Sequence, residues 1–97
     1  MTEQNITLTG ELDISNRPEI TALFKSAEHA DVVNIDMAAV TYIDSTALNS
    51  LITLQKSMIE HGHTGTINIL NPTPHVAHIF EICGLEKFFT IAKPTSL

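Results

Sequence analysis

The chain has 97 residues and a formal charge of -6, from 11 acidic and 5 basic side chains. With 43% hydrophobic and 16% charged residues it has enough apolar side chains for a core, which excludes a disordered protein. We expect one domain over residues 1–97. We also expect it to be cytoplasmic, because the polar start of the chain is unlike a signal peptide and no apolar run is long enough to insert into a membrane.

The positions of the cationic side chains argue against nucleic acid as the main ligand. They are scattered along the chain, at Arg17, Lys25, Lys56, Lys87 and Lys93. Binding to phosphates needs a patch or stripe of Lys and Arg, which this spacing does not supply. The aromatic residues are four Phe and one Tyr with no Trp, so we expect no platform for stacking bases.

The first part of the chain predicts a strand, a helix and a second strand. Residues 6–9 alternate apolar and polar side chains, as a half-buried strand does, and Gly10 is expected to end it. A helix capped by the side chain of Asn16 should follow and end near His29. Its apolar residues recur every three or four positions, at Ile20, Leu23, Phe24 and Ala27. Residues 31–37 are a β-branched run typical of a buried strand.

The second part predicts two further helices, each followed by a strand. In chain order these are a helix with an apolar face from Leu48 to Ile59 and a stop at Gly62, a strand over 66–70, a helix from Thr73 to Gly84, and a strand over 88–92. Residues 38–43 are expected to connect the second strand to the second helix. Strands separated by helices need crossover connections, so this order predicts an α/β domain with a largely parallel sheet.

Cys83 is the only cysteine and closes the apolar run 79–83. It cannot form a disulfide within the chain. The surrounding apolar residues predict that it is a small buried hydrophobic residue and not a reactive thiol.

The tripeptide Asp44–Ser45–Thr46 directly precedes the apolar face of the second helix. Asp, Ser and Thr commonly cap helices, and capping alone explains most such tripeptides. A hydroxyl at a helix N-terminus is also a place where a phosphate is favoured by free N–H groups and by the helix dipole. As a nucleophile Ser45 would need a general base, and no G-x-S-x-G motif or assigned histidine supplies one. Asp44 as a phosphoryl acceptor would need a lysine or metal. We therefore do not expect an enzyme.

Two histidine pairs have spacings that metal sites use. His61 and His63 flank a helix stop, while His75 and His78 are three residues apart on a helix. Neither pair has a cysteine partner or a third ligand close by, so we expect no metal site, and zinc binding stays open only as a minor alternative. The glycines are isolated at the ends of elements, so no phosphate loop and no cofactor are expected either.

Three blocks of the sequence together resemble the STAS domain, and most closely the bacterial anti-sigma factor antagonists. They are Leu8–Asp13, Val40–Leu48 and Gly84–Leu85, and their order and spacing match over nearly the whole chain. The resemblance implies a single domain with a mixed, mainly parallel sheet and helices largely on one face. Ala47 and Asn49 depart from the pattern, since many members have glycines there.

The resemblance also implies a function. Ser45 would be the phosphoacceptor of a serine kinase that is itself an anti-sigma factor, and a PP2C-type phosphatase would remove the phosphate. The unphosphorylated form would bind the kinase and so release a sigma factor. The residues expected to flank the phosphosite and bind the partner are Asp13, Asp44, Thr46, Ala47 and Leu48, and Thr46 is a possible second acceptor.

Two other functions remain open from the sequence. One is an accessory subunit of a membrane transport complex of the lipid-transport ABC type, which would contact an ATPase without being phosphorylated. The other is a sensor of a nucleotide or another small ligand. The Ser after Asp44 favours partner switching over the transport subunit, because the resemblance implies Thr at this position in some accessory subunits. A phosphate on Ser45 would add about −1.5 to −2 charges beside carboxylates on a docking surface, which should weaken docking.

Overall fold

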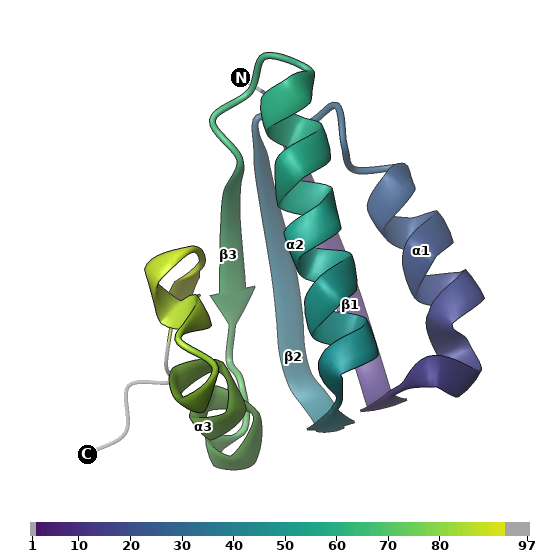
Figure 1. Ribbon diagram of the computed structural model, residues 1–97, viewed down its shortest axis with the longest axis vertical. Coiled ribbons are helices and arrows are strands. Elements are labelled where there is room, and N and C mark those ends of the chain that lie inside the picture. Colours follow the sequence, from purple (N-terminus) through teal and green to yellow (C-terminus); the bar gives the residue numbers. More distant parts are fainter. Residues whose placement is uncertain (1, 93–97) are drawn as a thin grey trace.

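The sheet has four strands, and each neighbouring pair is parallel. The computed structural model describes residues 2–92. In the sheet order β1-β2-β3-β4 the strands are Glu3–Leu12, Val32–Ile43, Thr66–Leu70 and Thr90–Ala92 (Figure 1). The predicted α/β class and parallel sheet are therefore confirmed.

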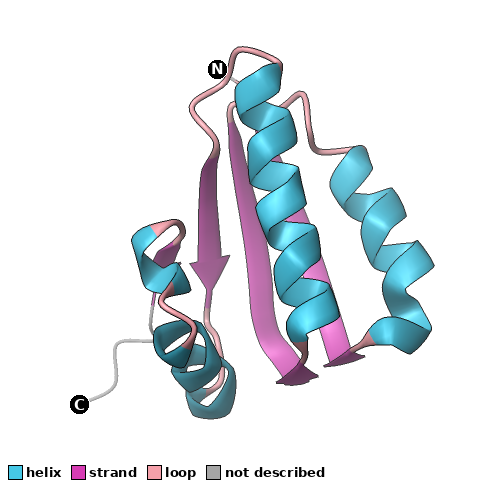
Figure 2. Ribbon diagram, in the orientation of Figure 1, coloured by secondary structure: helices cyan, strands magenta, loops and turns pink. Residues whose placement is uncertain are grey.

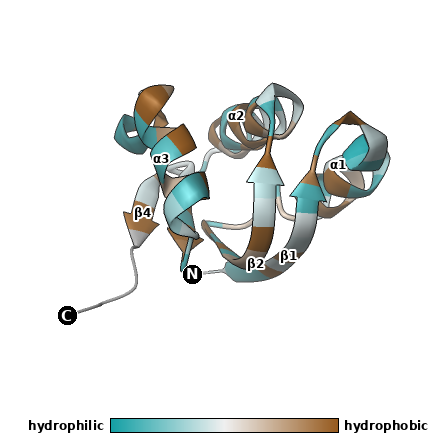
Figure 3. Cartoon of the chain, turned by 90° about the horizontal axis from the view of Figure 1, so that it is seen from below, coloured by the Kyte–Doolittle hydropathy of each residue, from teal (hydrophilic) through white to brown (hydrophobic). Residues whose placement is uncertain are grey.

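Three α-helices connect the strands and cover one face of the sheet (Figure 3). They are α1 (Arg17–Lys25), α2 (Ser45–Glu60) and α3 (Pro74–Ile82), and two 3-10 turns, η1 (Ile14–Asn16) and η2 (Leu85–Lys87), complete the connections (Figure 2). Among the described residues, no helix is both long enough and apolar enough to cross a bilayer.

The core lies between the helices and one face of the sheet. Side chains that alternate along the strands are buried there, at Ile6, Leu8, Val33, Ile35, Met37, Ile67 and Ile69. The helices contribute Ile20, Phe24, Leu51, Leu54, Met58, Val76 and Phe80. Burial of each large apolar side chain stabilises the fold by about 1.5–3 kcal/mol, and this opposes the entropy lost on folding.

The other face of the sheet carries a ladder of amide side chains. Asn5, Asn34 and Asn68 are register partners on β1, β2 and β3. The amide of Asn34 donates to Asn5 at 3.0 Å, and the amide of Asn68 donates to Asn34 at 2.8 Å. The side chain of Asn34 thus bridges its two register partners on a face that no described helix covers.

Both long strands extend further than the sequence predicts. Gly10 does not end β1, because the strand continues to Leu12 through register shifts on either side of Leu8 and between Gly10 and Glu11. Residues 38–43 belong to β2 and are not a connection. In this part of β2 the buried residues, Val40 and Ile43, are three apart. The irregular register breaks the alternation that identifies a strand.

The first helix differs from the prediction at both ends. The side chain of Asn16 does not cap α1: its oxygen accepts from the N–H of Asp13 at 2.9 Å, and its amide donates to the carbonyl of Glu11. Asn16 therefore ties η1 to the end of β1. The helix ends at Lys25 and not near residue 29, and Leu23 is 42% exposed although its spacing predicted burial.

The C-terminal part of the described chain corrects two further predictions. Cys83 is exposed and not buried. It follows the last residue of α3 as the C-cap of that helix. The last strand begins at Thr90 and not at Phe88, because η2 and a turn occupy the preceding residues.

Candidate functional site

Ser45 is the first residue of α2, and its side chain is exposed at the end of the helix nearest the carboxyl ends of β1 and β2 (Figure 1). Ser45 as a residue is exposed, and within residues 2–92 no side chain forms a hydrogen bond with its hydroxyl.

Asp44 caps α2, as the tripeptide predicts. Its backbone is extended, with φ −110° and ψ −178°, and its Oδ1 accepts from the N–H of Thr46 at 2.9 Å and of Ala47 at 3.2 Å. The N–H of Leu48 donates to the carbonyl of Asp44 at 3.1 Å. A carboxylate therefore already occupies N–H groups that would otherwise be free for a phosphate, which corrects the expectation of an open anion site at this terminus.

Asp13 lies beside Asp44 through the backbone of the two neighbouring strands. The N–H of Asp44 donates to the carbonyl of Leu12, at 3.1 Å, and Asp13 is the next residue. The hydroxyl of Ser15 is the main cause of a lowered pKa at Asp13, and the N–H of Ser15 adds to it. The Asp13 carboxylate is thus stabilised in its charged form next to the start of α2.

The other residues predicted to flank the phosphosite differ in how deeply they are buried. Thr46 is half-buried, whereas Ala47 and Leu48 are 2% and 7% exposed and belong to the core. The side chains of Ala47 and Leu48 therefore hold α2 against the sheet, and little of their surface faces a partner.

The structure adds exposed apolar side chains that the sequence did not single out. Ile14 is 70% exposed and follows Asp13, and Tyr42 is 44% exposed and lies two residues before Asp44. The ring of His75, from the start of α3, is stacked on Tyr42 with 6.3 Å between centroids and 22° between planes. In the sequence, the only signal for these exposed side chains was the position of Tyr42 two residues before Asp44. Asp13, Ile14, Tyr42, Asp44 and Ser45 all lie at or next to the carboxyl ends of β1 and β2, and we call these residues the Ser45 rim.

A pocket of about 330 Å³ lies between α1 and α2 and begins next to the Ser45 rim. Arg17 and Thr46 line it at the start of the two helices, and Glu28 and Ser57 line it towards their ends. Arg17 and Lys25 thus share this pocket with Thr46, the neighbour of Ser45.

The histidine pairs singled out in the sequence do not converge. Nδ1 of His61 lies 2.7 Å from the carbonyl oxygen of Ser57, whereas Nδ1 of His63 lies 2.9 Å from Oδ1 of Asp31. On α3, His75 stacks on Tyr42. The rings of His61, His63 and His75 are therefore each held by a different neighbour.

Comparison with known proteins gives a family match and several similar structures. The family model described as the STAS domain matches residues 3–96. An anti-sigma factor antagonist from Mycobacterium paratuberculosis has a similar structure, with a TM-score of 0.79 at 20% identity over 97% of this chain and 79% of that one. No curated protein matches the sequence.

Two structures of the anti-sigma factor antagonist SpoIIAA are also similar. The unphosphorylated form has a TM-score of 0.78 at 21% identity, covering 95% of this chain and 81% of that one. The phosphorylated form, described as a Bacillus cell fate determinant, has a TM-score of 0.68 at 20% identity, covering 95% and 84%. These likenesses show a common fold, and the match over nearly all of the sequence shows that the chain belongs to the STAS domain family.

Proposed function

We propose that this chain is an anti-sigma factor antagonist and that phosphorylation of Ser45 abolishes its binding to an anti-sigma factor. The observation that carries the proposal is the exposure of Ser45 at the first position of α2, within a rim that also includes exposed apolar residues. Structural similarity to anti-sigma factor antagonists supports the role.

The unphosphorylated rim is suited to docking against another protein. Ile14 and Tyr42 supply exposed apolar area at the same strand ends as Ser45, and exposed apolar side chains framed by polar groups are typical of interaction sites. The partner would be a serine kinase that is also an anti-sigma factor, and a PP2C-type phosphatase would regenerate the binding form. Both would meet the chain in the cytoplasm.

The capping of α2 explains why a phosphate would oppose docking. A phosphate on Ser45 adds about −1.5 to −2 charges. The N–H groups of Thr46 and Ala47 already donate to Asp44, so they do not neutralise the added charge. The phosphate then lies near the carboxylates of Asp13 and Asp44, and a partner must desolvate all three groups to approach. Like-charge repulsion and this desolvation weaken the complex.

Exposure distinguishes Ser45 from Thr46 as the acceptor. Ser45 is exposed, whereas Thr46 is half-buried and lines the pocket between α1 and α2. A kinase must bring the γ-phosphate in line with the attacking hydroxyl, and the more exposed hydroxyl allows this with less rearrangement. We therefore assign phosphorylation to Ser45 alone.

The test uses purified chain and a serine kinase of the anti-sigma type from the same genome, with Mg²⁺ and ATP. Fragment mass spectra are expected to place one phosphate on Ser45, and this signal should disappear in Ser45→Ala and persist in Thr46→Ala. Binding to the kinase is then measured by calorimetry for Ser45→Asp, which should bind at least about tenfold more weakly than the wild type.

Thr53→Asp is the matched control. It places the same charge on an exposed position of α2 about 12 Å further along the helix. It should bind the kinase as the wild type does. Retention of wild-type affinity by Ser45→Asp would reject the electrostatic switch. Absence of phosphate on Ser45, together with copurification of an ATPase, would favour the transport-complex subunit instead.

A further inference from the structure

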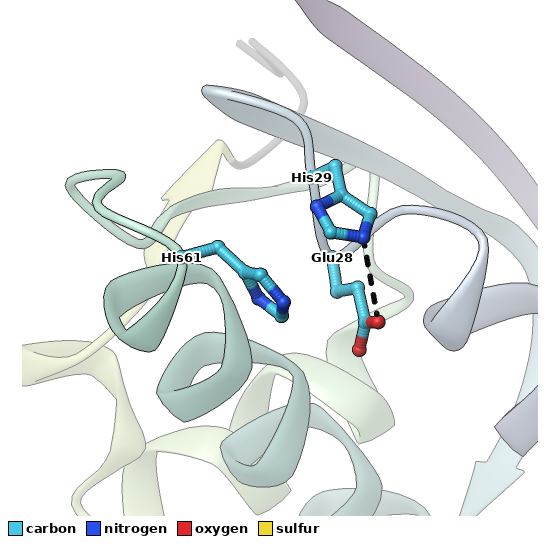
Figure 4. A group of neighbouring side chains, drawn as sticks. All are labelled: Glu28, His29 and His61. Carbon is cyan, nitrogen blue, oxygen red and sulfur yellow. Dashed lines mark ion pairs between the residues drawn. The ribbon is translucent and has the colours of Figure 1, made fainter.

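A second cluster of polar side chains lies at the opposite end of α2 from Ser45. Glu28 and His29 come from the turn after α1, and His61 is the C-cap of α2. Their candidate ligand atoms all lie within 4.8 Å of one another, and the three side chains approach one another from two segments of the chain (Figure 4). Two imidazoles and one carboxylate are donors that zinc commonly uses.

The environment of His61 leaves the correct nitrogen free for a metal. Its Nδ1 lies 2.7 Å from the carbonyl oxygen of Ser57. A carbonyl oxygen only accepts hydrogen bonds, so Nδ1 must carry the proton. In the neutral ring Nε2 then holds the free electron pair. Histidine ligands in metal sites are commonly oriented by such a bond from the second ring nitrogen to a carbonyl.

The local charge favours a cation at this place. The C-terminal end of a helix carries about half a negative charge, and His61 is the residue that ends α2. Glu28 adds a carboxylate, whose Oε1 lies 3.7 Å from Nε2 of His29. The chain as a whole has a formal charge of -6, which further favours a divalent cation.

Small side-chain movements are enough to form a site. In a tetrahedral site with bonds of about 2.1 Å, neighbouring ligand atoms are about 3.4 Å apart. His29 is 69% exposed, so its torsion angles are free to close the remaining distance, and the centroids of the His29 and His61 rings are already 4.2 Å apart. His63, two residues after His61, is hydrogen-bonded to Asp31 and does not need to move for the site to form.

We propose that Glu28, His29 and His61 bind one zinc ion, with water as the fourth ligand. The ion would link the turn after α1 to the end of α2, across 32 positions of the sequence from His29 to His61. Such a link stabilises the packing of the two helices at the end remote from the Ser45 rim. The site therefore adds to the proposed function without sharing residues with it.

The test is a titration of the purified chain with Zn²⁺ at neutral pH, followed by calorimetry and thermal unfolding. Cys83→Ser serves as the background, because Cys83 is exposed and a free thiol is itself a zinc ligand. One equivalent of zinc should bind, and at a hundredfold excess over Kd the Tm should rise by on the order of 10 °C. Loss of a direct ligand in His29→Gln or His61→Gln should weaken binding by at least about tenfold.

His75→Gln and His78→Gln are the controls, because they remove exposed histidines from α3 that lie outside the cluster. They should leave zinc binding unchanged, and all variants should have the wild-type Tm without zinc. Absence of binding at excess zinc would overturn the proposal. Wild-type zinc affinity in both His29→Gln and His61→Gln would also overturn the proposal. Loss of zinc binding in either control variant would overturn it too.

Discussion

The backbone N–H of Asp44 donates a hydrogen bond of 3.1 Å to the carbonyl oxygen of Leu12. This bond extends the β1–β2 ladder by one step beyond its last register pair, Leu12 with Ile43. It holds Asp44, the residue before Ser45, against Leu12, the residue before Asp13. The proposed phosphoacceptor and its acidic neighbour are thus brought together by backbone pairing, and substitution of their side chains should leave the rim in place.

Substitutions of Asp44 separate its capping role from its charge. Asp44→Ala removes the oxygen that accepts from Thr46 and Ala47, and should lower the free energy of unfolding by about 0.5–2 kcal/mol. Asp44→Asn keeps an equally good cap without the charge, and should be close to wild type. Urea denaturation measures both. Equal destabilisation by the two variants would contradict a capping role.

Phe80 and Phe88 form a matched pair for testing the core. Phe80 is fully buried and packs edge-to-face on Phe89, with ring centroids 6.2 Å apart, whereas Phe88 is 60% exposed. Phe80→Ala should reduce the free energy of unfolding by about 3–5 kcal/mol, and Phe88→Ala should change it by less than about 0.5 kcal/mol. Both values come from denaturant unfolding. A loss at Phe88 as large as that at Phe80 would show that the C-terminal part packs differently.

Gly62 and Gly65 separate backbone strain from steric clash. Both have positive φ, 86° and 75°, and Gly62 confirms the left-handed helix stop predicted from the sequence. A Cβ at Gly62 meets nothing within 4 Å, whereas one at Gly65 would lie 2.9 Å from Cγ1 of Ile59. Gly62→Ala should cost about 1–2 kcal/mol from the left-handed conformation alone, and Gly65→Ala should cost more. Thermal unfolding measures both variants, and equal losses of Tm would show that Ile59 moves aside freely.

Acid should destabilise the fold through two carboxylates. The pKa of Asp13 is lowered by the Ser15 hydroxyl, and that of Asp31 by the N–H of Thr2 and by His63. Both therefore bind protons more weakly in the folded than in the unfolded state. Their stabilisation is fully present above the unfolded pKa and is lost as pH falls through the folded pKa.

The measurement is the Tm as a function of pH from neutral to below about pH 4. The wild-type Tm should fall over the acid part of this range. The double variant Asp13→Asn/Asp31→Asn should show a shallower fall, because its amides do not titrate. Parallel curves would mean that other carboxyl groups cause the acid unfolding.

Local signals predicted the order of elements and several of their ends. Residues 66–70 form β3 as their alternation indicates, and the hydroxyl of Thr73 accepts from the N–H of Val76 at 3.3 Å, as expected of an N-cap. Gly84 adopts the left-handed conformation that follows α3. Each of these features depends on residues within about one helical turn, so the sequence contains the needed information.

Features that depend on distant residues were not predictable. The length of β2 depends on pairing with β1, whose irregular register hides the alternation after Met37. The predicted docking surface included Ala47, which is buried, and left out Ile14, which is exposed. The burial of these two residues is decided by how α2 and η1 pack on the sheet. The cluster around His61 was missed for the same reason, since its partners lie in the turn after α1.

The parallel pairing of β1 with β2 has a consequence for biosynthesis. Partner positions such as Glu3 and Val32 are separated by the whole of α1, so β1 has no ladder to join until β2 has left the ribosome. At about 5–20 residues per second this interval is roughly 1.5–6 s. During it the apolar side chains of β1, including Ile6 and Leu8, are unprotected. The nascent chain is therefore most open to chaperones and to misassociation before its second strand appears.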